Sequence, residues 1–321
     1  MGGFLIATAL FLQTVAQLGT HVLFGTLGGI LFEKVGNMNL GIEGMMLLGA
    51  ATGFAVAYNT QNALLAVIAS GLAGAAGALI YAIITITLRG NQVVTGLALT
   101  TFGSGAAGLI GMSVAGVPLP ENVTSVLGIH RIPVLADIPI VGKMLFEQSP
   151  FVLGAIILAV VLYIYYKYTN IGLNARVVGE SPAAADASGI NVSLYKYLHV
   201  LAGGFLCGIG GGYFSMVYVG KWQIDLTAGA GWISVALIIF AMWNPLRAIL
   251  GAYLFGAVRG LTFKLQSGLV IFGHTVSVSA QILDMAPYIV TILVLMFITM
   301  KNRREYSAPE SLGAPYFREN R

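Results

Sequence analysis

The chain has 321 residues, of which 57% are hydrophobic and only 9% are charged, whereas about 25% of the residues in an ordinary soluble domain are charged. Its mean hydropathy is +0.87, and 16 Lys and Arg against 12 Asp and Glu give a net charge of +4. This composition excludes an ordinary soluble fold. The basic residues are spread over short polar segments, so they form no sequence patch for nucleic acid, and the single cysteine, Cys207, has no disulfide partner.

Apolar blocks of about the length that crosses a bilayer recur along the chain. They predict an all-α, polytopic transmembrane helical bundle of about nine spans, at 4–32, 39–58, 63–88, 93–113, 150–168, 194–219, 229–243, 246–263 and 280–300. Gly41, Glu43 and Gly44 interrupt the second block, which predicts one broken helix. The chain then divides into a transmembrane domain, residues 1–300, and a C-terminal tail, residues 301–321.

Basic residues in the connecting segments orient this bundle. Counting the spans places Arg89, Lys167, Arg176, Arg247 and the cluster that follows the last span on one face, and the positive-inside rule makes that face cytoplasmic. The C-terminus is then cytoplasmic and the N-terminus external. Two connections are too long to be simple turns, an external loop at 114–149 and a cytoplasmic loop at 169–193, and loops of this length usually have a function.

The cytoplasmic loop contains the pattern of a short helix. Ser181 offers a capping hydroxyl, Pro182 suits the first helical position, and Gly189 ends the run of helix-forming residues. Such a helix is too short to span a membrane. It either docks into a groove on a soluble partner or is an ordinary surface helix.

Polar residues inside the spans are candidates for a substrate pathway, because they are costly in lipid and usually face protein or water. Asn39 and Glu43 are four residues apart, so we expect them to share a helix face. Glu43 either contacts the substrate or caps the N–H groups of the broken helix.

Two further groups of polar residues stand at helix starts. Asn91, Gln92 and Thr95 either line an inner gate or cap the helix that they begin. Trp232 and Ser234 open a later helix, where stacking and hydrogen bonding suit a planar base or a sugar. Trp232 as an anchor at the membrane interface is the alternative interpretation.

A faint internal repeat relates the two halves of the chain. Asn62, Leu64, Ala66, Leu72, Gly74 and Ala75 align with Asn244, Leu246, Ala248, Leu254, Gly256 and Ala257 at an offset of 182 residues. The predicted topology gives the two copies opposite orientations, as in the inverted repeats of transporters, although chance similarity between two helices rich in small residues stays open. Gly204, Gly208 and Gly212 fall inside a span and predict close helix packing instead of a nucleotide loop.

The stretch from Arg176 to Asn191 resembles the coupling-helix region of permease subunits of bacterial ABC importers, in the branch that serves simple sugars, nucleosides and branched-chain amino acids. The signature of that region is Glu-Ala-Ala followed, after three residues, by Gly. Ala184, Ala185 and Gly189 match it, whereas Ala183 occupies the Glu position. The segments 36–49, 89–96 and 308–321 are similar to other parts of nucleoside-type permeases.

This resemblance implies a non-enzymatic permease subunit of the bacterial cytoplasmic membrane, which binds no cofactor itself. Its expected partners are a second permease subunit with a different sequence, an ATP-binding cassette subunit that carries ATP and Mg, and an external substrate-binding protein or lipoprotein. Coupling to the ATPase would involve Arg176, Glu180, Ser181, Pro182, Ala184, Ala185 and Gly189. A nucleoside is the leading cargo, and riboflavin and simple sugars are the alternatives.

Two other classes of function stay open. A secondary transporter would normally need paired intramembrane carboxylates or unwound carbonyl groups for a coupling ion, and Glu43 is nearly alone in the spans. An intramembrane enzyme would need a nucleophile with its base or a metal cluster, and the sequence offers neither pattern. The chain also has no phosphate-binding loop of its own.

Overall fold

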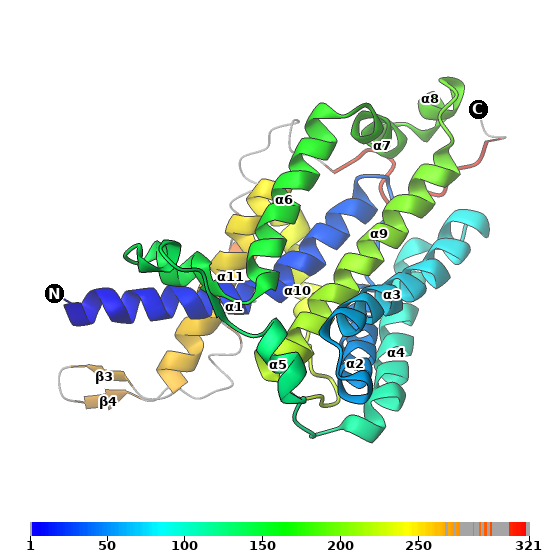
Figure 1. Ribbon diagram of the computed structural model, residues 1–321. Coiled ribbons are helices and arrows are strands. Elements are labelled where there is room, and N and C mark those ends of the chain that lie inside the picture. Colours follow the sequence, from blue (N-terminus) through cyan, green and yellow to red (C-terminus); the bar gives the residue numbers. More distant parts are fainter. Residues whose placement is uncertain are drawn as a thin grey trace.

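The computed structural model of the chain is a bundle of helices (Figure 1). It describes residues 2–266, 269–271, 274–276 and 308–318, together with single helical positions at 285, 289, 292, 293 and 296. The helices are α1 (Gly2–Glu33), α2 (Ile42–Thr60), α3 (Ala63–Ala82), α4 (Gln92–Gly111), α5 (Glu121–Leu127), α6 (Pro150–Tyr168), α7 (Asn170–Glu180), α8 (Pro182–Ala187), α9 (Val192–Tyr213), α10 (Ala230–Phe240) and α11 (Pro245–Gln266). The predicted helical fold class is confirmed.

Short irregular elements extend or connect these helices. One π-helical turn, η1 (Ile83–Thr87), extends α3, and another, η5 (Phe214–Val219), extends α9. Two antiparallel strand pairs are present, β1 (His130–Arg131) with β2 (Glu147–Gln148) and β3 (Leu269–Ile271) with β4 (His274–Val276).

Six helical segments in the described residues are long and apolar enough to cross a membrane. They are Leu5–Glu33, Ala63–Thr87, Gln92–Val114, Pro150–Tyr168, Val192–Val219 and Pro245–Gln266. The predicted blocks 39–58 and 229–243 correspond to α2 and to α10, which has only 11 residues. The block 280–300 lies largely outside the described residues, so the count of nine spans stays a prediction.

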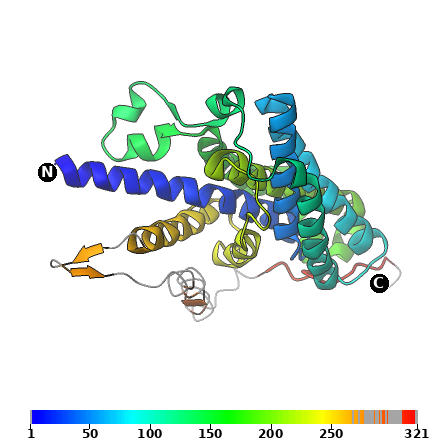
Figure 2. The same cartoon turned by 90° about the horizontal axis from the view of Figure 1, so that it is seen from below.

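Helix α1 runs through the middle of the bundle and is almost entirely buried from Val15 onward (Figures 1 and 2). It packs closely against α9 at Gly28, where an added Cβ would lie 2.5 Å from the carbonyl oxygen of Gly203. The same Cβ would lie 2.6 Å from Sγ of Cys207, which is buried at this contact. Small residues thus let the two central backbones approach each other.

The matched glycines of the sequence repeat occupy corresponding positions around this central pair. Gly74 of α3 packs against α9, and a Cβ there would collide with the carbonyl oxygen of Gly204. Gly256 of α11 packs against α1, and a Cβ there would collide with the carbonyl oxygen of Val15. Helix α2 likewise packs on α9 and α10 on α1. The neighbours of α1 therefore correspond to the neighbours of α9, and the glycines of α9 serve close packing as predicted.

The structure corrects the position of the predicted helix break. Residues 34–41 form a non-helical segment after α1, and α2 then runs without interruption from Ile42, with Glu43 and Gly44 in its first turn. Asn39 lies before the helix, so it shares no helix face with Glu43. The spacing of four residues was misleading because it assumes that both residues are helical.

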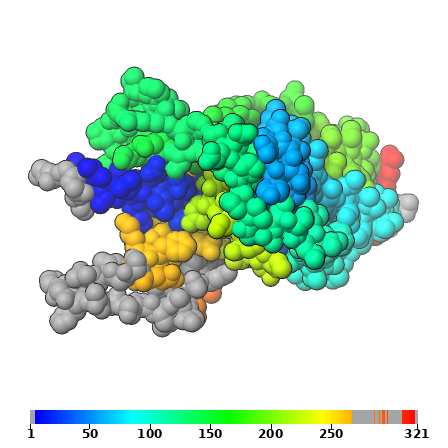
Figure 3. Space-filling view, turned by 60° about the horizontal axis from the view of Figure 1, so that its bottom comes forward, coloured from blue at the N-terminus to red at the C-terminus, as the bar shows by residue number. Residues whose placement is uncertain are grey.

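Both long loops are ordered. The loop 114–149 contains α5, β1 and β2, and Figure 3 shows its green part beside the blue N-terminal half of α1. The side chain of Gln13 donates to the backbone oxygen of Glu147 at 2.8 Å and joins the loop to α1. The loop 169–193 contains two helices, α7 and α8, where the sequence predicted one. Helix α7 was missed because its cap, Thr169, follows α6 directly; the Thr169 hydroxyl accepts from the N–H of Gly172 at 3.0 Å.

Candidate functional site

Glu43 joins the first turn of α2 to the first turn of α10. Its buried carboxylate accepts hydrogen bonds from the hydroxyl of Thr227 at 2.5 Å and from the backbone N–H groups of Gly229 at 3.0 Å and Gly231 at 2.5 Å. The first N–H groups of a helix lack intrahelical partners, and a carboxylate there also interacts favourably with the helix dipole. Glu43 thus caps the start of α10 and not, as the sequence predicted, a break in its own helix, because the partner helix start is remote in sequence. A contact of Glu43 with substrate stays a prediction.

The 34–41 segment is fixed by side chains from two other helices. Its Met38 N–H donates to Oε1 of Gln92 at 2.7 Å, and the Met38 carbonyl oxygen accepts from the hydroxyl of Tyr81 at 2.6 Å. Oδ1 of Asn39 accepts from the N–H of Gly41 at 2.8 Å, a local turn bond. Gln92 and Asn39 thus hold the backbone that leads into α2.

Asn91 and Thr95 both act at the start of α4. Oδ1 of Asn91 accepts from the N–H of Val94 at 3.0 Å, which is the geometry of an N-cap. The hydroxyl of Thr95 donates to the Asn91 carbonyl oxygen at 2.7 Å. Asn91 therefore caps α4, whereas Thr95 only bonds back to a carbonyl oxygen of the same helix. A role of either side chain in an inner gate stays a prediction.

Trp232 and Ser234 lie on α10, directly after the turn that Glu43 caps. Trp232 is 38% exposed at the surface of this chain. Ser234 is buried, with Oγ 2.9 Å from the carbonyl oxygen of Ala230 and 3.2 Å from that of Val22 on α1. The predicted pathway residues therefore lie at or near the starts of α2, α4 and α10. On α10, Trp232 is exposed and Ser234 is buried.

The predicted coupling region comprises α7 and α8. Arg176 and Glu180 are exposed residues of α7, not of an irregular loop. Oγ of Ser181 accepts from the N–H of Ala184 at 3.3 Å, and Pro182 takes the first position of α8. The predicted cap and helix start are confirmed.

The short helix α8 presents one face to solvent and one to the bundle. Ala185 is fully buried, whereas Ala184 is exposed. Gly189 follows the helix with a φ of +81°, and a Cβ there would meet nothing within 4 Å. Gly189 is therefore needed for its backbone conformation, since non-glycine residues rarely adopt a positive φ.

The C-terminal tail, residues 308–318, packs on this coupling region. The N–H and the hydroxyl of Ser311 donate to the carbonyl oxygen of Gly179 at 3.1 and 2.5 Å, and the N–H of Gly313 donates to Gly36 at 3.2 Å. The tail thus touches both α7 and the 34–41 segment. The sequence of the tail resembles that of other permeases, but no local pattern in it indicates these contacts.

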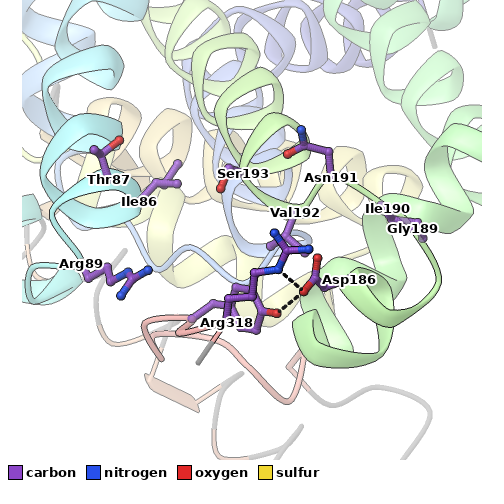
Figure 4. Close-up of a pocket in the computed structure, with 11 residues that line it drawn as sticks. Ile86, Thr87, Arg89, Asp186, Gly189, Ile190, Asn191, Val192, Ser193 and Arg318 are labelled. Atoms are coloured by element: carbon purple, nitrogen blue, oxygen red, sulfur yellow. Dashed lines mark hydrogen bonds and ion pairs between the residues drawn. The ribbon is translucent and has the colours of Figure 1, made fainter. Parts of the chain in front are cut away.

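Figure 4 shows where the tail reaches α8. Asp186 of α8 accepts from the hydroxyl of Tyr316 at 3.0 Å and pairs with Nε of Arg318 at 3.1 Å. A cavity of about 530 Å³ lies beside this pair, lined by residues of η1, α8, the start of α9 and the tail. Arg89 borders the same cavity, and its guanidinium lies 4.7 Å from the centre of the Phe317 ring. The tail therefore links the α3–α4 connection to α8.

The described residues contain no group of three or more His, Cys, Asp or Glu side chains that could hold a metal ion.

The chain matches the family described as branched-chain amino acid transport system, permease component, over residues 11–300. TsgC13 of Haloferax volcanii, named "putative glucose ABC transporter permease protein", is 32% identical to this chain. The match covers 96% of this chain and 97% of TsgC13. The nucleoside ABC transporter permease protein NupC of Lactococcus lactis is also 32% identical, and the match covers 93% of this chain and 94% of NupC. The guanosine ABC transporter permease protein NupQ of Bacillus subtilis is 33% identical, over 92% of each chain.

Among solved structures, PsaBC from Streptococcus pneumoniae in complex with Fab has a similar fold. The comparison covers 94% of this chain and 100% of that chain, with a TM-score of 0.51 and 13% sequence identity. At this identity the likeness concerns the fold alone.

Proposed function

Because the chain belongs to the family of branched-chain amino acid transport system permease components, we propose that it forms half of the translocation pathway of an ATP-driven importer of nucleosides. The chain is the multi-pass membrane permease component and not itself an enzyme. ATP and Mg are bound by a separate ATP-binding subunit, and this chain needs no cofactor of its own.

The observation that carries the coupling role is the position of α8. It is a capped helix of six residues with an exposed alanine face, and it lies beside α7 and the tail at the end of the bundle far from the first turns of α1 (Figures 1 and 2). A short helix with small exposed side chains can enter a groove on a soluble partner. Arg176 and Glu180 on α7 flank it and complete the proposed docking surface.

This arrangement supports a cytoplasmic C-terminus and an external N-terminus. The basic residues Arg89, Lys167 and Arg176 lie at the same end as the tail, which is the cytoplasmic end by the positive-inside rule. The external loop 114–149 then faces a substrate-binding protein or lipoprotein. A second permease subunit with a different sequence would supply the other half of the pathway.

The pathway is proposed to pass the starts of α2, α4 and α10. Helices that begin inside a bundle present N–H groups and loop carbonyl groups to a cavity, as at the substrate sites of inverted-repeat transporters. The corresponding packing of Gly74 and Gly256 supports such an inverted repeat. Trp232 is exposed next to the α10 start and offers a ring that could stack on a planar cargo.

The names of the relatives support a nucleoside as the cargo, with glucose or another simple sugar as the second candidate. NupC and NupQ are named for a nucleoside and for guanosine, and TsgC13 is named for glucose. These relatives lend no support to riboflavin, the third cargo that the sequence left open.

Purification of the tagged chain in mild detergent, followed by mass spectrometry, tests the assembly. We expect an ATP-binding subunit and a second permease to copurify. Uptake into liposomes that hold this complex should then need ATP and should favour guanosine over glucose. Recovery of the chain alone, with uptake that follows an ion gradient and ignores ATP, would overturn the proposal in favour of a secondary transporter. Preferred uptake of glucose would overturn only the cargo.

A further inference from the structure

Four basic residues that lie far apart in the sequence line one cavity at the proposed cytoplasmic end. Lys34 follows α1, Lys167 lies near the end of α6, Arg176 lies on α7 and Arg247 lies at the start of α11. The cavity has a volume of about 350 Å³. Its other described lining residues are Tyr163, Tyr166, Met242, Trp243, Asn244 and Pro245, so no carboxylate is among them.

Lys34 shows how burial and neighbouring charges act in this cavity. Burial lowers the pKa of Lys34, and the neighbouring Arg176 lowers it further, while Glu180 acts in the opposite direction. Oε2 of Glu180 also accepts from the backbone N–H of Glu310 at 3.2 Å. The described lining of the cavity contains cations and no carboxylate, which favours an anion there. Lys, Arg, Asn and Tyr side chains are suitable hydrogen-bond donors for phosphate oxygens.

An exposed apolar face leads away from the cavity along α6. Ile157, Val160, Val161, Ile164 and Tyr168 follow helical spacing and are each at least 40% exposed. Lys167 connects this face to the cavity, since its Nζ lies 2.8 Å from the hydroxyl of Tyr163 and 5.2 Å from the centre of the Tyr168 ring. Aromatic and basic residues at the end of an apolar face are typical of the membrane interface.

A second exposed apolar face leads away along α11. Leu250 and Leu254 lie three and seven residues after Arg247, so the three share one side of the helix. Leu250 is 70% exposed and Leu254 is 46% exposed. Helices α6 and α11 pack against each other. Basic side chains thus lie at the end of two adjacent apolar faces. This arrangement suits an anionic lipid, whose headgroup is negatively charged and whose acyl chains are apolar.

We propose that this cavity binds the phosphate headgroup of an anionic phospholipid of the cytoplasmic leaflet, with its acyl chains along α6 and α11. Basic pockets between transmembrane helices on this side of a membrane are suited to such headgroups. The site would join α1, α6, α7 and α11 through one ligand. It is independent of the cargo, and only the choice of leaflet rests on the proposed orientation.

Native mass spectrometry of the delipidated, purified complex tests this site with added phosphatidylglycerol and phosphatidylcholine. We expect the wild-type complex to prefer phosphatidylglycerol. The double variant Lys34→Gln, Arg247→Gln should weaken that binding by roughly 25-fold, about fivefold for each charge removed. Lys143→Gln, which removes one charge from the external loop, is the control and should keep the preference.

Further measurements separate the lipid from other occupants and from misfolding. If the double variant fails to assemble, Lys167→Gln alone should still cost about fivefold, since Lys167 is exposed and contacts only tyrosines in the described residues. Inorganic phosphate or glycerophosphoglycerol that binds as tightly as the intact lipid would overturn the proposal in favour of a free anion. If the isolated permease binds the lipid but docking of the ATP-binding subunit abolishes this binding, the cavity is instead a contact surface for that subunit.

Discussion

Tyr316 in the C-terminal tail donates its hydroxyl hydrogen to Oδ2 of Asp186 on α8, at 3.0 Å. The same carboxylate oxygen pairs with Arg318, and Ser311, five residues before Tyr316, is hydrogen-bonded to Gly179 of α7. The tail therefore holds α8 from one side while it touches the 34–41 segment through Gly313. A displacement of α8 by a docked ATPase would be passed along this connection toward the start of α2.

Tyr316→Phe should uncouple transport from ATP hydrolysis without loss of assembly. A hydrogen bond to a charged group contributes about 1.5–3 kcal/mol at most when it is well shielded, and less in this partly exposed tail. We expect cargo transported per ATP to fall by about threefold in liposomes. Glu310→Gln is the matched control, because it changes the same segment but keeps the backbone N–H that Glu310 donates to Glu180. An unchanged ratio in Tyr316→Phe would show that the tail plays no part in coupling.

Glu43→Gln should destabilise the junction of α2 and α10. The amide group of glutamine would bring N–H donors toward the N–H groups of Gly229 and Gly231, which now donate to the carboxylate. A buried donor without an acceptor costs about 1–3 kcal/mol. We expect a lower thermal unfolding midpoint of the purified complex, together with impaired uptake. Wild-type stability with a defect in uptake alone would instead favour a direct contact between Glu43 and the substrate.

Local features of the site could be predicted from the sequence, and long-range ones could not. The cap at Ser181 and the stop at Gly189 act on neighbouring residues, so the pattern itself reveals helix α8. The partners Glu43 and Gly231 are 188 residues apart, and no local pattern records which helix start a carboxylate will reach. For the same reason, the sequence indicates only that the cations Lys34 and Arg247 lie at membrane-flanking positions. It does not show that the fold brings them to one cavity.

Gly74→Ala should destabilise the bundle, because the new Cβ would collide with the backbone of Gly204 on α9, which cannot rotate away. Overpacking of this kind costs about 1–3 kcal/mol. Gly256→Ala should have a similar effect at the α1–α11 contact, as the repeat predicts. Thermal unfolding in detergent measures both.

Gly105→Ala is the control for these two variants. A Cβ at Gly105 of α4 would meet nothing within 4 Å. Alanine there should be neutral or stabilise the helix by up to about 1 kcal/mol. Equal losses at Gly105 and Gly74 would mean that close packing is not the reason for these glycines.

Gly189→Val should impair coupling through the backbone and not through a collision. The φ of +81° at Gly189 is unfavourable for side chains, most of all for β-branched ones, while the space around a Cβ is open. The cost is about 1–2 kcal/mol, which the chain can relieve by shifting the end of α8. Gly189→Asn should be tolerated better, because asparagine adopts this region more readily. We therefore expect ATP-driven uptake to decrease in the order wild type, Asn, Val, with membrane insertion unchanged.

Equal loss of uptake in both variants would point to a direct contact of the Gly189 surface with the ATP-binding subunit, since added bulk and not backbone strain would then decide the outcome.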